Sequence, residues 1–116
     1  LKKYIHYFLN NKMKINITKT QRARLVKDWL NDMFSDVEMM NGYYVKNGKK
    51  LAYHNIYVDS FSIKYKRFFF NYDTIWSFLE SMFSLEYKEL QSITEDWVEE
   101  TLNLKGYRTF SSVHLN

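Results

Sequence analysis

The sequence contains no cysteine and no proline, and only three of its 116 residues are glycine. The absence of cysteine excludes disulfides, thiolate metal sites and cysteine nucleophiles. No stretch approaches the roughly 20 consecutive apolar residues of a membrane-spanning helix. The apolar run from Tyr4 to Leu9 is short and interrupted by a polar residue, and no small-residue cleavage site follows it, so it does not fit a signal peptide. We therefore expect a cytoplasmic protein with no membrane segment.

Aromatic residues, in contrast, are abundant: ten Tyr, nine Phe and three Trp make up 19% of the chain. Because 46% of the residues are hydrophobic, burial can offset the loss of chain entropy, and disorder is not expected. The length suits one domain. We predict a single domain over residues 1–116, with the folded core at 13–116. Residues 1–12 are interpreted as an extension or an alternative start, because Met13 resembles an ordinary protein start.

Apolar residues recur with the spacing of an amphipathic helix between residues 19 and 40. Thr18 and Gln21 stand three residues apart, as the two partners of a capping box do at a helix start. Asn41-Gly42 comes just after the last apolar residues, at a position where helices often end on glycine. The pattern predicts one helix over residues 19–40.

The middle of the chain has the alternation typical of β-strands. Asn47-Gly48 lies between two such runs and is a strong hairpin signal, because a type I′ turn needs positive φ at both of its central residues. Beyond Asp59-Ser60, apolar and polar side chains alternate from Phe61 to Lys66 and predict a third strand. That strand continues into Phe68-Phe69-Phe70, which requires cover on both of its faces.

The remaining segments complete the predicted order. Asp73 is expected to cap a second helix and Thr94 to open a third, with a looser helical stretch over residues 86–93. Short strands are expected at 13–17 and at 107–113. The order (β)-α-β-β-β-α-α-(β) predicts an α+β fold: an antiparallel sheet of three to five strands, packed with an N-terminal amphipathic helix and two to three C-terminal helices.

The sequence carries no motif of catalysis or of cofactor binding. His6, His54 and His114 lie on separate predicted elements and have no neighbouring ligand at metal-binding spacing. Glycine-rich phosphate loops and a Gly-x-Ser-x-Gly nucleophile signature are also missing from the sequence. We therefore expect no enzyme, no cofactor and no metal site.

Charge is sorted along the chain. Residues 1–27 carry eight Lys or Arg and no acid, whereas residues 68–104 carry eight Asp or Glu and one Lys. The net charge of +4 therefore hides a basic front half and an acidic back half. Such a dipolar chain can dock on phosphate with one end or on a basic surface with the other.

An acidic face is predicted on the third helix, formed by Glu95, Asp96, Glu99 and Glu100. Like charges at i,i+4 spacing destabilise a helix, although acids near its N-terminus recover part of that cost. The simplest interpretation is a solvated helix face. The functional interpretation is a docking surface for a basic partner.

Basic residues offer a second candidate surface. They are Arg24 and Lys27 on the first helix, Lys46, Lys49 and Lys50 at the hairpin tip, and Lys64 and Lys66 on the third strand. A lysine-rich hairpin with tyrosines on neighbouring strands suits phosphate contact and base stacking. The same pattern also suits an ordinary solvated hairpin or a protected edge strand.

Three functions follow as hypotheses. The favoured one is a small non-catalytic interaction protein that docks on a protein partner, such as a nucleic-acid-handling or defence enzyme, and modulates or inhibits it. A composition rich in Lys, Asn, Ile, Tyr and Phe is typical of AT-rich genes and favours a phage or mobile-element origin. The alternative is a nucleic-acid-binding module that uses the basic first helix and hairpin. The third is a structural subunit that self-associates through Phe68, Phe69 and Phe70.

Overall fold

The computed structural model describes residues 18–115 and has an α+β fold. Its elements are α2 (Lys19–Met33), β1 (Glu38–Met40), β2 (Tyr43–Lys46), β3 (Lys49–Val58), β4 (Lys64–Asn71), a π-helical turn (Tyr72–Trp76), α3 (Ser77–Phe83), α4 (Tyr87–Leu102) and β5 (Arg108–Ser112). They confirm the predicted fold class. The strand predicted at 13–17 and the extension predicted at 1–12 lie outside the described residues.

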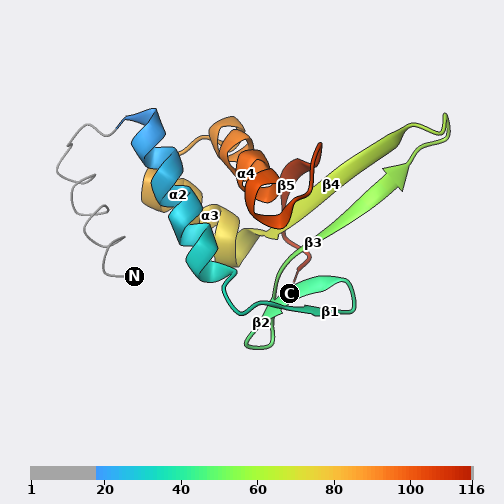
Figure 1. Cartoon of the computed structure of the whole chain (residues 1–116), viewed down its shortest axis with the longest axis horizontal. Helices are drawn as coiled ribbons and strands as arrows, with labels where there is room; N and C mark the ends of the chain where they lie inside the picture. The colour runs from blue at the N-terminus through green and yellow to red at the C-terminus, as the bar shows by residue number, and fades with distance from the viewer. Residues whose placement is uncertain (1–17, 116) are drawn as a thin grey trace.

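The strands form one five-stranded sheet in the order β1-β2-β3-β4-β5. Neighbouring strands are antiparallel except β4 and β5, which run parallel, with Arg67 opposite Arg108 and Phe69 opposite Phe110. The three helices gather on one side of the sheet (Figure 1). The short strand predicted at 107–113 is present as β5, which lies at one edge of the sheet.

The first helix begins as predicted but ends earlier. Thr18 and Gln21 form both hydrogen bonds of the capping box, at 3.1 and 2.9 Å. The helix stops at Met33, and the last residues of the predicted helix form β1 instead. Asn41 and Gly42 both have positive φ and make a turn into β2, so this Asn-Gly pair is a hairpin signal and not a helix end.

The C-terminal helices also differ in detail from the prediction. Asn71, not Asp73, caps the first helical segment, because its Oδ1 accepts a hydrogen bond from the Thr74 backbone N–H at 3.0 Å. Thr94 does not open a helix. It is buried in the middle of α4, where its hydroxyl donates to the Leu90 carbonyl at 2.7 Å. A threonine that bonds back to its own helix needs no cap position, so one helix spans both predicted segments.

The core lies between the sheet and the helices. Phe70 on β4 is fully buried, and its ring centre is 6.1 Å from that of Phe34, 6.0 Å from that of Trp76 and 6.2 Å from that of Trp97. Phe68, two residues earlier, is buried on the same face of the strand. The helices therefore cover the face of β4 that carries these two rings.

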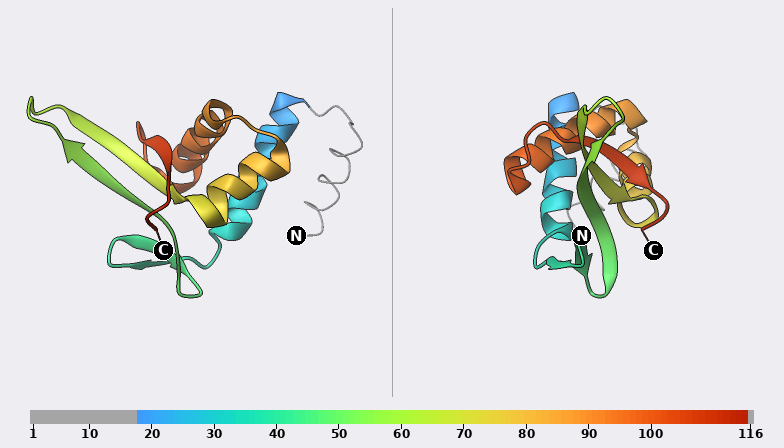
Figure 2. Two further views of the ribbon diagram at one scale, coloured as in Figure 1. Left: turned by 180° about the vertical axis from the view of Figure 1, so that it is seen from behind. Right: turned by 90° about the vertical axis from the view of Figure 1, so that its right-hand side faces the viewer.

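Strands β3 and β4 extend well beyond their neighbours. On one side, pairing with β2 ends at Tyr53, and on the other side β5 begins only opposite Arg67. Residues 56–66, which we call the arm, therefore form a two-stranded ribbon with a turn at its end. The arm points away from the helices in Figure 1 and in the left view of Figure 2. Apart from Asp59, which is half-buried, all residues of the arm are exposed.

Candidate functional site

A groove of about 480 Å³ lies where the arm leaves the body of the protein. Four of its eight lining residues are cationic and three are aromatic. The eight are Tyr57, Lys64, Tyr65, Lys66, Arg67, Gly106, Arg108 and Phe110. Strand geometry creates this groove, because β5 starts opposite Arg67 and leaves the edge of β4 at Lys64–Lys66 uncovered. We call these eight residues the basic groove.

Arg67 is the most firmly held cation of the basic groove. Its Nε donates to Asn55 Oδ1 on the paired strand at 3.0 Å. Its guanidinium lies 4.7 Å from the ring centre of Tyr57 and 5.3 Å from that of Phe69. These cation–π contacts orient the guanidinium without neutralising it. Among residues 18–115, no carboxylate pairs with Arg67, so its charge is available to an anion.

Lys64 and Lys66 lie on the face of β4 opposite to Arg67, because side chains alternate along a strand. Lys66 Nζ is 3.5 Å from the Lys105 carbonyl oxygen and 5.8 Å from the ring centre of Tyr107. Both lysines are exposed. The groove is therefore flanked by cations on both faces of the strand edge.

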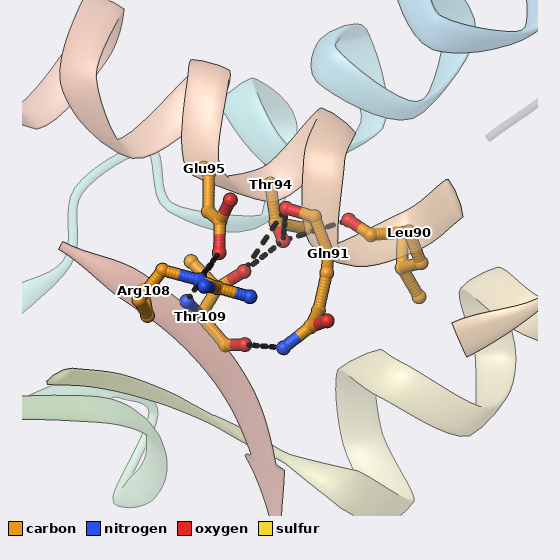
Figure 3. Close-up of polar contacts among 6 residues, drawn as sticks. All are labelled: Leu90, Gln91, Thr94, Glu95, Arg108 and Thr109. Atoms are coloured by element: carbon orange, nitrogen blue, oxygen red, sulfur yellow. Dashed lines mark hydrogen bonds and ion pairs between the residues drawn. The ribbon is translucent and has the colours of Figure 1, made fainter. Parts of the chain in front are cut away.

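Arg108 is held by an acid of α4. Glu95 Oε2 accepts from Arg108 Nε at 2.8 Å and from the Thr109 backbone N–H at 3.1 Å (Figure 3). The Arg108 side chain is still 67% exposed. Glu95 reduces the net charge of the groove and at the same time fixes where Arg108 lies.

A buried polar cluster beside this ion pair attaches β5 to α4 (Figure 3). The hydroxyls of Thr94 and Thr109 are 2.7 Å apart, and Gln91 Nε2 donates to the Thr109 carbonyl at 2.7 Å. Both threonines are fully buried. Because buried polar groups need partners, this cluster specifies the position of β5 and with it one wall of the basic groove.

The predicted acidic face is partly used inside the molecule. Glu95 binds Arg108, and Glu100 accepts from Lys27 Nζ at 3.0 Å. Asp96 and Glu99 are exposed and form no ion pair within residues 18–115. Two of the four predicted docking acids therefore form ion pairs within the molecule.

The predicted basic residues do not form one surface. Lys27 pairs with Glu100, and Lys50 Nζ lies 4.3 Å from the ring centre of Tyr43. Lys46 Nζ donates to the carbonyls of Asp32 and Met33, both at 3.2 Å, and thereby caps the end of α2. Arg24 and Lys49 are exposed on α2 and at the β2–β3 turn. Of the predicted set, the structure brings Lys64 and Lys66 together with the cations and rings of the basic groove.

The three consecutive phenylalanines divide between the two faces of the sheet. Phe68 and Phe70 are fully buried, so neither can contact a second copy as the self-association hypothesis requires. Phe69 is half-buried on the opposite face, in a row of rings with Tyr53 at 4.8 Å and Phe110 at 5.5 Å between ring centres. The prediction that both faces need cover holds, and aromatic neighbours supply part of that cover on the face of Phe69.

The described residues offer no alternative site of metal or membrane type. No three His, Cys, Asp or Glu side chains among them gather closely enough to hold a metal ion. His54 Nδ1 is 3.2 Å from the Tyr44 hydroxyl, and burial lowers the pKa of His54 below its usual value. No helix within residues 18–115 is both long and apolar enough to cross a membrane.

Several residues of the basic groove were not selected from the sequence. Arg67, Arg108 and Phe110 are separated along the chain, and only the parallel pairing of β4 with β5 brings them together. Tyr57 and Tyr65 are opposite each other across the arm, with ring centres 6.1 Å apart. Alternate residues of a strand share a face. Continuing this alternation from Ile63 to Tyr65, Arg67 and Phe69 would have predicted a strand face that combines aromatic rings with a cation.

Comparisons of the chain with protein-family models, with curated proteins and with solved structures found no match. Two properties of the basic groove and the arm matter most: the concentration of cations at the groove and the exposure of apolar side chains along the arm.

Proposed function

We propose that this protein binds double-helical nucleic acid with the arm and the basic groove. The supporting observation is that Lys64 and Lys66 on the arm line one groove together with Arg67 and Arg108 at its base. Cations that converge on a surface with few acids attract the phosphate backbone and release its counterions. Two-stranded β-ribbons also have dimensions that let them enter a groove of a duplex.

The acids near this surface are already engaged. Glu95 is bound to Arg108, and Asp59 at the tip of the arm accepts hydrogen bonds from its own turn. The half-exposed rings of Tyr57 and Tyr65 lie on the same face of the strands as Arg67, where they can contact sugars and bases. Charge, shape and aromatic content thus support the same ligand class.

The test compares two triple variants of equal net charge. The first is Lys64→Gln, Lys66→Gln, Arg67→Gln, and the matched control is Lys19→Gln, Arg24→Gln, Lys88→Gln, which removes three cations that do not line the basic groove. Binding of a labelled duplex is followed by fluorescence anisotropy over a range of salt concentrations. Each lost phosphate contact should reduce the slope of log affinity against log salt by about 0.9.

We expect the first variant to lose about two to three units of that slope and the control to retain most of it. Equal losses in the two variants would mean that overall charge, and not the arm, drives binding. A wild-type protein that fails to bind duplex DNA or RNA at low salt would overturn the proposal.

A second candidate function is docking on a protein, such as a nucleic-acid-handling or defence enzyme. Its support is apolar: Ile56, Val58 and Ile63 on the arm are each about half exposed. Exposed apolar patches often mark protein interfaces. To distinguish the two functions, wild-type protein and an Ile56→Asp, Ile63→Asp variant are each used to capture partners from a nuclease-treated extract of the source cell. Partners that survive nuclease and are lost in the variant would favour protein docking.

A further inference from the structure

The tip of the arm holds a large apolar side chain out in solvent. Phe61 is 83% exposed, the largest exposed fraction of the large hydrophobic residues among residues 18–115. A ring in this position buries little surface, so it adds little to the stability of the fold. Its exposure at the end of a projecting ribbon points to a ligand.

The turn that carries Phe61 is closely hydrogen-bonded. Asp59 Oδ1 accepts from the backbone N–H groups of Phe61 and Ile63, both at 2.9 Å, and Oδ2 accepts from the Tyr65 hydroxyl at 3.1 Å. The Asp59 N–H donates to the Ile63 carbonyl at 3.0 Å, and Ser62 turns the chain with a φ of 63°. Because these bonds fix the backbone on both sides of Phe61, the ring is presented at a defined place at low entropic cost on binding.

The charges behind the tip suit a polyanion. Lys64 pairs with Val58 directly behind the turn, and Lys66 and Arg67 follow along the same strand. Asp59 is the single acid within the arm, and both of its carboxylate oxygens accept hydrogen bonds from the turn. An apolar tip followed by cations therefore matches a base stack bordered by phosphates.

We propose that Phe61 is a wedge that inserts between adjacent base pairs of double-helical DNA, while Lys64, Lys66 and Arg67 contact the phosphates on either side. Apolar side chains inserted in this way unstack one base step and bend the duplex. The inference rests on the proposed function and deepens it, because it names the ligand as duplex DNA and gives the arm a mechanical effect on it.

The experiment uses the full chain and a set of DNA duplexes that carry 2-aminopurine at different steps. Fluorescence of this base rises when it is unstacked, and anisotropy of a second label reports binding in the same sample. We expect wild-type protein to raise the fluorescence of the bound duplex. Phe61→Ala should abolish that rise while changing the affinity by less than about tenfold, and Phe61→Leu should restore part of it. Met39→Ala, which removes a 55% exposed apolar side chain from β1, is the matched control and should behave like wild type.

The outcomes separate the wedge from the proposed function. Duplex binding without a rise in fluorescence, or an equal rise with Phe61→Ala, would overturn the wedge and leave nucleic-acid binding standing. Absence of all duplex binding would overturn both. Sedimentation of the protein alone provides a third outcome: a wild-type dimer that becomes a monomer in Phe61→Ala would assign the ring to a second copy of this chain and overturn the wedge.

Discussion

The body of this protein, meaning the described residues outside the arm, and the arm use the same residue types in opposite ways. In the body, Phe70 is surrounded by Phe34, Trp76 and Trp97 and is fully buried. In the arm, Phe61 meets solvent. Since burial of apolar surface is the main favourable term in folding, the first ring stabilises the fold and the second does not. The aromatic content of the chain therefore serves two different purposes.

Polar contacts differ between the two regions as well. The body uses buried hydroxyls and paired acids to fix β5 against α4, as at Thr94 and Thr109. The arm uses exposed hydrogen bonds to Asp59 to shape a turn. Buried networks have large energetic consequences, whereas exposed ones mainly select a local conformation. A stable body that positions a projecting, weakly buried arm is the arrangement expected when the arm contacts a ligand.

The largest effect is expected when one phenylalanine is substituted in each region. Phe70→Ala should lower the free energy of unfolding by about 3–5 kcal/mol, because it opens a cavity in the core. Phe61→Ala should change it by less than about 0.5 kcal/mol, as exposed positions do. Urea denaturation followed by tryptophan fluorescence measures both. Similar losses in the two variants would show that the arm packs against the body.

A smaller effect is expected at the attachment of β5. Thr109→Val and Thr94→Val should each cost about 1 kcal/mol of unfolding free energy, because each removes a buried hydroxyl that is hydrogen-bonded. The double variant should cost less than the sum of the two, since the hydroxyls bond to each other. Urea denaturation of the four proteins in the cycle measures the coupling. Strict additivity would mean that the pair does not act as a unit.

Patterns of residues close together in the sequence predicted most helices and strands of the body. The capping box at Thr18 and the hairpin at Asn47-Gly48 depend on residues close in the chain, and both form as predicted. The end of α2 at Met33 could not be predicted from nearby residues in the sequence. Its carbonyls are capped by Lys46 from β2, and the Asn41-Gly42 pair that follows suits a helix end as well as a hairpin.

The candidate site was only partly predictable, for a topological reason. Lys64 and Lys66 could be selected because they lie together on one strand. Arg108 and Phe110 join them only through the parallel pairing of β4 with β5, and no local pattern specifies which strand neighbours which. The projection of the arm depends likewise on where β2 and β5 stop pairing.

The third prediction concerns how the unfolding free energy depends on pH through His54, which lies on β3 two residues before the arm. Burial lowers the pKa of His54 in the folded state below its unfolded value of about 6.5. Its neutral form therefore stabilises the fold above that value, and this contribution is lost as the pH falls through the lowered pKa. His54→Gln should flatten the fall in unfolding free energy between about pH 7 and pH 5. An unchanged pH profile in the variant would contradict this assignment.

The smallest expected effect concerns the turn at the tip. Hydrogen bonds from the Ile63 and Phe61 backbone and from the Tyr65 hydroxyl hold the pKa of Asp59 below its usual value. The carboxylate therefore supports the turn at neutral pH, and this support is lost as the pH falls through the lowered pKa. Asp59→Asn should speed amide exchange at Phe61 and Ile63 at neutral pH, because a neutral amide oxygen accepts these hydrogen bonds more weakly. Exchange in α4 and the urea midpoint should stay the same, since the turn lies outside the core. Faster exchange throughout the body would show that the arm and the body unfold together, which would remove the distinction between them.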